Sequence, residues 1–228
     1  MNSKSERHIP TQRPQLPEPT LRRLPWYLAY VRTLAAQGVE QVSSTRISRD
    51  LGVAATRIAK DLSFLDIKGK TRIGYDVASL ERTLTDFLDF TTSHRAVIIG
   101  AGSLGGALLR DTGLAQYGLK IVAAFDINPA IVDTSVCGVP VYHINDLAAV
   151  ARTCGATTAI LTVPYQISQQ AADDAVNCGF RAIWNFTPVR ITVPAGIAIA
   201  NTSIYAHLAL IYNRMMAGGE PATHDDLN

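Results

Sequence analysis

Ala96-Val97-Ile98-Ile99-Gly100-Ala101-Gly102-Ser103-Leu104-Gly105 is the stretch that decides the fold of the longer part of this 228-residue chain. Its first four residues form an apolar run typical of a strand that is buried on both faces, and a Gly-x-Gly-x-x-Gly motif follows directly. Gly100 permits a tight turn, Gly102 lets the backbone approach a pyrophosphate, and Gly105 lets the next helix pack closely on the sheet. The N–H groups at the start of that helix attract phosphates. This order of strand, glycine turn and helix predicts a dinucleotide-binding fold.

A carboxylate stands at the matching place after the second predicted strand. That strand ends at Asp126, which lies 21 residues beyond Gly105 and is followed by Ile127. A carboxylate at this position accepts hydrogen bonds from the adenosine ribose and repels a 2′-phosphate. The sequence therefore predicts NAD(H), rather than NADP(H), as the cofactor.

The rest of this part alternates apolar runs with stretches of helical composition. Strands are expected at residues 121–125, 159–163 and 182–184, and helices at residues 104–110, 144–153 and 167–178. Such alternation predicts an α/β fold with a parallel sheet and right-handed crossovers. The length leaves room for a Rossmann-like domain but not for a separate substrate domain.

Charge divides the chain into two unequal parts. Residues 1–78 hold 13 Lys and Arg against 7 Asp and Glu, a net of +6, whereas residues 79–228 hold 8 against 12, a net of −4. A basic third joined to an acidic remainder is typical of a polyanion-binding module. Charge alone leaves a merely solvated basic surface equally open.

The basic third has the helix pattern of a DNA-binding head. Apolar residues recur at three- and four-residue steps over residues 20–38, which predicts an amphipathic helix. A short helix over residues 45–51, capped by Ser43 or Ser44, and a second over residues 54–65 follow. Together they predict a helix-turn-helix.

A basic hairpin is expected next, at residues 66–75, because two glycines stand there among alternating basic and β-branched residues. With the hairpin, the helix-turn-helix becomes a winged helix. Ile58 and Leu62 would face the core, which leaves Arg57 and Lys60 outward, within reach of base edges or phosphates of a double-stranded DNA operator. The candidate DNA-contacting residues are Ser44, Arg46, Thr56, Arg57, Lys60, Ser63, Lys68, Lys70 and Arg72.

No catalytic or metal-binding pattern accompanies the dinucleotide motif. His143 and His207 stand in no recognisable catalytic arrangement, and Cys137, Cys154 and Cys178 lack the paired spacing of a zinc or redox site. The prediction is therefore a regulator without catalytic residues or metal. Two alternatives stay open: an NAD-dependent oxidoreductase with an accessory basic domain, and a module that binds CoA or another nucleotide.

Composition places the protein among ordinary globular chains, with 47% hydrophobic and 18% charged residues, which excludes disorder and fibrous repeats. Its apolar stretches fall far short of the roughly 18 residues that span a bilayer, so no membrane association is expected. The first residues carry no apolar segment of a secretory signal, which predicts a cytoplasmic protein.

Six parts are expected along the chain. They are a flexible tail (1–19), a winged-helix DNA-binding domain (20–78), a connecting helix (79–92), a Rossmann-like domain (93–202), a terminal dimerisation helix (203–216) and a second flexible tail (217–228).

Several ordered segments resemble the Rex family of bacterial redox-sensing repressors over about Leu21 to Tyr212. Besides the glycine motif they are Val42-Ser43-Ser44, Lys60-Asp61-Leu62-Ser63-Phe64, Gly74-Tyr75-Asp76-Val77, Ala123-Ala124-Phe125-Asp126, Gly138-Val139-Pro140-Val141-Tyr142, Leu161-Thr162-Val163-Pro164 and Asn185-Phe186-Thr187-Pro188-Val189. The resemblance implies a homodimer whose terminal helices are swapped between subunits, and release of the operator when NADH binds.

The resemblance also implies further cofactor contacts. Two loops would line the nicotinamide side of the pocket, and Ile204 would approach it from the partner subunit. With the motif residues, the candidate cofactor-binding set is Gly100, Ala101, Gly102, Ser103, Leu104, Gly105, Asp126, Ile127, Thr162, Val163, Pro164, Asn185, Phe186, Pro188 and Ile204.

Four positions depart from the family pattern. Ala59 and Thr71 stand where the family commonly has basic residues of the DNA-binding head. Asp111 replaces an aromatic residue and Ser203 an acid, both of which take part in redox switching in the family. The resemblance therefore leaves open the operator sequence and the strength and sign of the NADH response.

Overall fold

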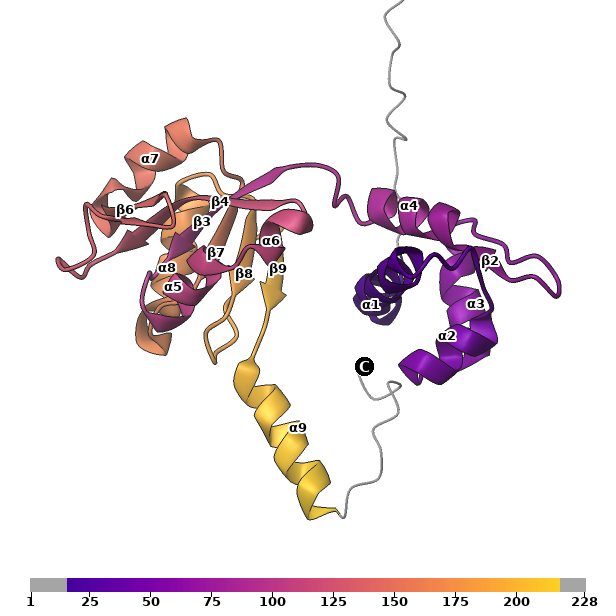
Figure 1. Ribbon diagram of the computed structural model, residues 1–228. Coiled ribbons are helices and arrows are strands. Elements are labelled where there is room, and N and C mark those ends of the chain that lie inside the picture. Colours follow the sequence, from indigo (N-terminus) through magenta and orange to yellow (C-terminus); the bar gives the residue numbers. More distant parts are fainter. Residues whose placement is uncertain (1–15, 218–228) are drawn as a thin grey trace, which may run out of the picture. The chain divides into compact units, whose positions relative to one another are not determined.

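The computed structural model describes residues 16–217, which form two compact units (Figure 1). The first unit ends at Asp89 and the second begins at Phe90. Most of both predicted tails, residues 1–15 and 218–228, lies outside the described residues.

The N-terminal unit is a small helical domain with one pair of short strands. Its elements are α1 (Glu18–Ala36), β1 (Gln41–Val42), α2 (Ser44–Leu51), α3 (Ala55–Ser63), β2 (Tyr75–Asp76) and α4 (Val77–Phe87). β1 and β2 pair antiparallel. The α1 helix packs against α4, and α2 packs against α3.

The first helix starts earlier than the sequence predicted. Pro17 is its N-cap, and Pro19 lies in its first turn rather than in a tail. Proline is tolerated there because the first-turn N–H groups have no intrahelical acceptor. The α2 helix begins as expected, with the Ser43 hydroxyl accepting a hydrogen bond from Arg46 N at 3.1 Å.

The helix expected to connect the two domains belongs to the core of the N-terminal unit. It begins at Val77 rather than Ser79, because the Asp76 carboxylate caps it by accepting from Ser79 N at 2.8 Å. Its residues Leu80 and Leu84 are fully buried. Their burial explains the helical period that the sequence showed.

The wing differs from the predicted hairpin. Between residues 66 and 75 the structure has one isolated bridge, from Lys70 to Gly74, closed around a turn in which Arg72 has φ +66°. Tyr75 pairs instead with Val42. The hairpin prediction is therefore wrong in extent, because the strand partner comes from β1, before the helix-turn-helix, and not from the adjacent residues.

The C-terminal unit is a Rossmann-like α/β domain. Its elements are β3 (His94–Ile99), α5 (Ser103–Arg110), α6 (Gly113–Gln116), β4 (Leu119–Asp126), β5 (Ser135–Val136), β6 (Val139–His143), η1 (Ile144–Asp146), α7 (Leu147–Cys154), β7 (Thr158–Leu161), η2 (Tyr165–Ile167), α8 (Ser168–Asn177), β8 (Ala182–Asn185), β9 (Ala198–Asn201) and α9 (Ile204–Met216). The sheet order is β5-β6-β4-β3-β7-β8-β9. Every strand pair is parallel except β5 with β6.

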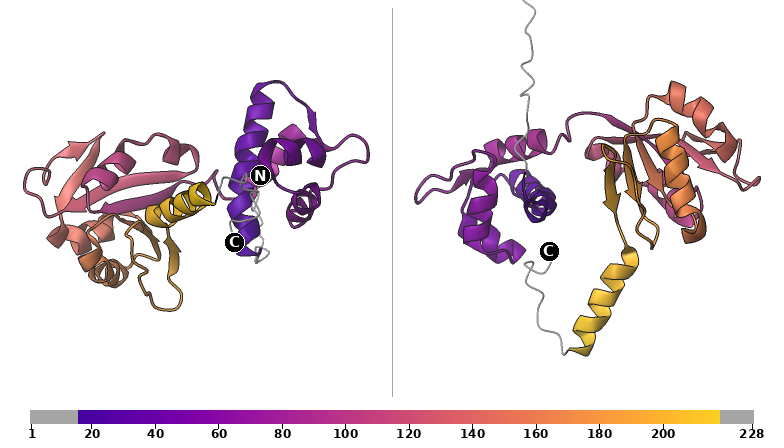
Figure 2. Two further views of the ribbon diagram at one scale, coloured as in Figure 1. Left: turned by 90° about the horizontal axis from the view of Figure 1, so that it is seen from below. Right: turned by 180° about the vertical axis from the view of Figure 1, so that it is seen from behind.

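Helices cover both faces of this sheet (Figure 2). Val97 and Ile99 face the cluster that includes residues of α7 and α8, whereas Ala96 and Ile98 face the cluster that includes Leu109 of α5. Burial on both faces explains why the strands are continuous apolar runs. The sequence did not predict the edge strands β5 and β9, nor the short α6.

The order of the strands indicates where on the sheet a ligand is expected to bind. The chain passes from β3 to β4 and β6 on one side, then returns to β7 on the other side of β3. Ligands of such sheets bind outside the carboxyl ends of the strands where the order reverses. In this domain that point lies beside Gly100 and Thr162.

Candidate functional sites

Two of the three motif glycines in the turn after β3 leave no room for a side chain, whereas Gly102 faces open space. A Cβ at Gly105 would overlap the carbonyl oxygen of Gly100, and a Cβ at Gly100, which has φ +98°, would lie 2.9 Å from the Thr162 carbonyl. Gly102, the N-cap of α5, supplies no capping side chain. The turn therefore presents backbone at the start of α5, as a phosphate-binding turn requires.

Asp126 lies against this turn. Its Oδ2 accepts from Ala101 N at 2.7 Å, and its Oδ1 accepts from Ile127 N at 2.8 Å and Asn128 N at 2.9 Å. A carboxylate has about four acceptor sites, so these three bonds leave capacity for a hydroxyl donor. The backbone thus holds the predicted ribose-binding carboxylate at the end of β4.

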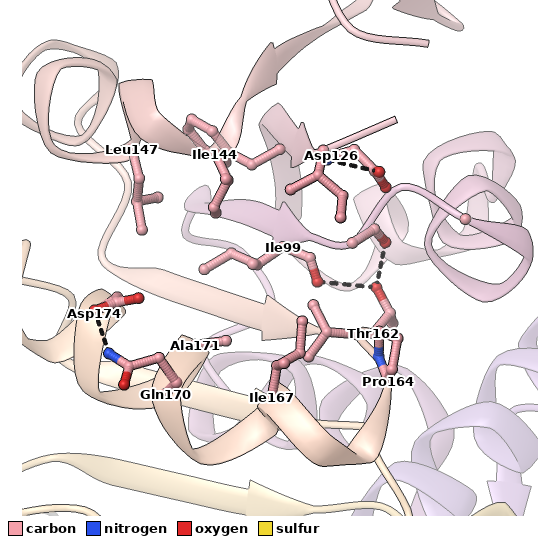
Figure 3. A pocket seen from close by; sticks show the side chains of 15 residues that line it. Ile99, Asp126, Ile144, Leu147, Thr162, Pro164, Ile167, Gln170, Ala171 and Asp174 are labelled. Atoms are coloured by element: carbon pink, nitrogen blue, oxygen red, sulfur yellow. Dashed lines mark hydrogen bonds between the residues drawn. The ribbon is translucent and has the colours of Figure 1, made fainter. Parts of the chain in front are cut away.

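A pocket of about 460 Å³ opens at the carboxyl ends of β3, β4 and β7 (Figure 3). Seven of the predicted cofactor residues line it: Gly100, Gly102, Asp126, Ile127, Thr162, Val163 and Pro164. The predicted cofactor set missed the rest of the wall, namely Ile99, Phe125, Ile144, Leu147, Ile167, Gln170, Ala171 and Asp174. Pockets that are mostly apolar with a few polar groups are typical sites for small ligands.

Thr162 joins the glycine turn to the strand beside it. Its hydroxyl lies within hydrogen-bond distance of Gly100 O, at 2.6 Å, and of Ile99 O, at 3.3 Å (Figure 3). Its backbone N–H also donates to Ile99 O, at 3.0 Å. The predicted strand 159–163 therefore ends two residues early, at Leu161, because Thr162 already turns toward the pocket.

The other predicted cofactor residues do not line this pocket: Ala101, Ser103, Leu104, Gly105, Asn185, Phe186, Pro188 and Ile204. Asn185 is fully buried, and its amide donates to Val189 O and Asn201 Oδ1 while its oxygen accepts from Thr187. Its side chain therefore holds the loop after β8 against β9. Ile204 begins α9 with 47% of its surface exposed.

Two residues that depart from the family pattern accept a hydrogen bond from a first-turn N–H of a helix: Asp111 directly precedes Thr112, the N-cap of α6, and Ser203 is the N-cap of α9. Asp111 Oδ1 accepts from Leu114 N at 2.9 Å, and Ser203 Oγ accepts from Ala206 N at 3.2 Å. Neither residue belongs to the pocket wall.

His143, which directly precedes the pocket residue Ile144, has a local role, since its Nδ1 accepts from Asn145 N at 3.2 Å. Cys137 is exposed, and Cys154 and Cys178 are half-buried. Among residues 16–217, no group of three His, Cys, Asp or Glu side chains could hold a metal ion. Within the same range, no helix is long and apolar enough to cross a membrane.

The N-terminal unit exposes the predicted DNA-reading face. Thr56, Lys60 and Ser63 of α3 are exposed, Arg57 is half-buried, and Ile58 and Leu62 are buried on the opposite side. The Ser63 hydroxyl donates to Lys60 O at 2.7 Å, so it is held against its own helix.

The remaining candidates for DNA contact lie on the wing and on α2. Lys68, Lys70 and Arg72 of the wing are exposed. Ser44 and Arg46 of α2 are half-buried, and Arg46 lies 3.8 Å from Asp50.

Sequence reasoning missed one polar cluster in this unit. Asp61 of α3 is buried and bonded to Thr20, Arg23 and Tyr27 of α1. The signal that could have found it is spacing, because Asp61 follows Ile58 by three residues and therefore shares its buried face.

The two units define a class of protein in which a winged-helix DNA-binding head is joined to a nucleotide-binding Rossmann-like domain. A family model described as the CoA binding domain matches residues 91–189, and one described as the putative DNA-binding protein N-terminus matches residues 15–63.

Curated relatives named redox-sensing transcriptional repressor Rex are similar over most of the chain. Those of Porphyromonas gingivalis and Bacteroides fragilis are 54% and 52% identical over 88% of this chain and 92% and 91% of their own. A crystal structure of RSP with β-NAD⁺ and operator DNA is similar at TM-score 0.84 and 31% identity, covering 89% of this chain and 94% of that one. RSP with β-NADH is similar at TM-score 0.80 and 31% identity, covering 89% of this chain and 95% of that one. The chain belongs to the Rex family of redox-sensing transcriptional repressors.

Proposed function

We propose that this protein is a transcriptional repressor that binds operator DNA with its N-terminal unit, binds NAD(H) with its C-terminal unit, and releases the operator when NADH binds. The observation that carries the proposal is the Asp126 carboxylate, which is held against the glycine turn in the wall of the pocket, in a chain that also exposes Lys60 on a winged helix. Relatives with these two units are named redox-sensing repressors.

The cofactor contacts proposed are the predicted residues that line the pocket, with the ribose on Asp126 and the pyrophosphate at the start of α5. The glycines support this placement, because Gly100 and Gly105 let the turn and α5 pack closely against the chain's own backbone, and Gly102 leaves open space at the start of α5. The loop after β8, which Asn185 holds, would flank the nicotinamide.

The DNA contacts proposed are the exposed side chains of α3 for base edges in the major groove, and Lys68, Lys70 and Arg72 of the wing for the backbone or the minor groove. Such a division makes α3 responsible for sequence selection and the wing responsible for general affinity.

A homodimer is part of the proposal. Ile204, Leu208, Ile211 and Met215 form an apolar stripe along α9, and each is at least 37% exposed. A stripe of this kind is buried when two copies associate about a two-fold axis. Exchange of α9 between the subunits would couple both cofactor sites to both N-terminal DNA-binding units. We expect the dimer to act in the cytoplasm, because a repressor must reach its operator on the chromosome.

DNA selection from a random pool, repeated with saturating NAD⁺ and with saturating NADH, tests the proposal. A ligand shifts a protein between DNA-competent and released states only by as much as it prefers one of them. We expect enrichment of a two-fold sequence with NAD⁺ and its loss with NADH. Equal operator affinity with both cofactors would refute redox sensing while leaving DNA binding intact.

Two further measurements separate the alternatives. An oxidoreductase would oxidise NADH with turnover when carbonyl substrates are added, and we expect none. A CoA-binding module would bind CoA in competition with NADH, whereas the Asp126 carboxylate favours a ligand whose adenosine ribose carries no phosphate, since it would repel the 3′-phosphate of CoA as well as a 2′-phosphate.

A further inference from the structure

The DNA-reading helix α3 carries a buried carboxylate that cannot itself reach DNA. The Asp61 side chain is 2% exposed, and that of its ion-pair partner Arg23 is 9% exposed. Arg23 Nε donates to Oδ2 at 2.7 Å and Nη2 donates to Oδ1 at 2.9 Å, which makes a two-point pair. Tyr27 Oη donates to Oδ2 at 2.8 Å and Thr20 Oγ1 donates to Oδ1 at 2.9 Å. All four acceptor sites of one carboxylate are therefore filled by α1.

These donors come from one face of α1, because residues 20, 23 and 27 follow the three- and four-residue spacing of a helix. Burial alone would raise the pKa of Asp61, but the hydrogen bonds from Arg23, Tyr27 and Thr20 outweigh it, so its pKa is lowered. The carboxylate is therefore charged in the folded unit.

A buried pair of this kind is poor evidence for stability, since an apolar pair of similar volume is often as stable. Its distinctive property is its defined geometry. A two-point pair between a guanidinium and a carboxylate fixes both the distance and the relative rotation of the two groups, whereas apolar contacts do not. The α3 helix needs such a constraint, because it has nine residues and Ala54 gives it no side-chain cap. A helix of that length depends on packing for its order.

We infer that the buried Asp61–Arg23–Tyr27–Thr20 cluster sets the rotation of α3 about its axis and thereby aims Lys60 and its neighbours at the base edges; Asp61 is a positioning residue for operator selection. Lys60 directly precedes Asp61 in α3. A rotation of about 20° moves a side chain at a radius of about 5 Å by nearly 2 Å. Hydrogen bonds to bases tolerate a spread of only about 0.5 Å.

The experiment measures the ratio of affinity for the selected operator to affinity for a random duplex of equal length, at several salt concentrations. The full-length protein is used. The inference rests on the proposed function, because the measurement requires an operator that the protein selects. If the parent itself selects no sequence, the proposed function fails. If the parent selects one, the variants test the positioning role alone.

The variant Asp61→Asn distinguishes an effect of charge from an effect of positioning, because the two effects change operator affinity in opposite directions. Removing a negative charge from a DNA-binding head strengthens binding to all DNA by electrostatics. Loss of positioning instead lowers operator affinity at least tenfold, with random-duplex affinity and salt slope unchanged within twofold. The matched control is Asp86→Asn on α4, an exposed acid in the same unit, which we expect to keep the parent ratio.

Two further variants keep the test decisive if Asp61→Asn fails to fold. Arg23→Lys keeps the charge but loses the two-point fork, and Tyr27→Phe removes one donor without changing charge. We expect the operator-to-random ratio to fall at least fivefold and about twofold, respectively, while the affinity for NADH stays at the parent value. Parent ratios in both variants would overturn the inference, whatever their thermal stability.

Discussion

Replacing Asp126 by Ala is the sharpest test of the cofactor site, because this carboxylate accepts three hydrogen bonds from the backbone N–H groups of Ala101, Ile127 and Asn128 and is predicted to accept another from the ribose. The substitution removes the acceptor of Ala101 N, which lies in the glycine turn and belongs to a residue that is 8% exposed. It also removes the charge-assisted acceptor for the ribose hydroxyls. Two effects are therefore expected, one on stability and one on affinity.

The magnitudes follow from the hydrogen bonds involved. A buried N–H left without a partner lowers the free energy of unfolding by about 1–3 kcal/mol. Loss of a hydrogen bond to a charged group weakens NADH binding by about 1–3 kcal/mol, which is roughly 5- to 150-fold at 1.36 kcal/mol per tenfold. Removal of the charge also removes the repulsion of a 2′-phosphate, so the preference for NADH over NADPH narrows.

Asp126→Asn separates these effects. Its amide oxygen can still accept from Ala101 N, but it carries no charge. We expect it to keep more of the thermal stability than Asp126→Ala and to lose a similar part of the discrimination against NADPH. Asp173→Asn, an exposed acid on α8 outside the pocket wall, is the control for charge and should match the parent.

Cofactor fluorescence titrated with NADH and with NADPH gives both affinities, and thermal unfolding without cofactor gives the stability. Parent affinity and parent selectivity in Asp126→Ala would refute the assignment of this carboxylate to the ribose. A loss of stability alone would leave Asp126 with the structural role that its backbone bonds already show.

Four other outcomes are expected. Gly105→Ala should abolish NADH binding, measured by the same titration, because the added Cβ would overlap the Gly100 carbonyl. Lys60→Ala should relax operator selection in mobility shifts, whereas Lys70→Ala should weaken binding to all duplexes and reduce the salt slope by about 1. Removal of residues 203–228 should give monomers in sedimentation analysis; dimers without α9 would contradict its proposed role. Because the pKa of Asp61 is lowered in the folded protein, its contribution to stability is present above the unfolded pKa of about 3.9 and is lost as pH falls through the folded pKa. The free energy of unfolding, measured by denaturant titration at several acidic pH values, should therefore fall less steeply with pH in Asp61→Asn than in the parent.

Most of the fold could be predicted from local patterns in the sequence. The apolar run before Gly100 lies in a strand, the Gly-x-Gly-x-x-Gly turn opens a helix, and Asp126 ends the next strand. These features were predictable because each depends on residues that are near one another in the chain: burial on two faces, glycine φ freedom and helix period. The class of cofactor follows from the same short segments.

The wall of the pocket could not be predicted in this way. Ile144, Leu147 and Asp174 reach the pocket from elements that follow separate crossovers of the sheet, and no local pattern distinguishes them from other helical residues. The wing was over-predicted for a related reason, since Tyr75 found its strand partner in β1. Strand pairing is decided by tertiary packing rather than by the segment itself.

The sequence by itself determined the two units, the glycine turn and the basic face of α3. Only the tertiary structure decided that Arg23 and Asp61, which are 38 residues apart, form a buried pair. Spacing places Asp61 on the buried face of its helix, but no local pattern identifies Arg23 as its partner, because a charged residue is normally exposed. Folding packs α1 against α3 and removes water from the Arg23 guanidinium and the Asp61 carboxylate. Each buried charge then requires the other as its hydrogen-bonding partner.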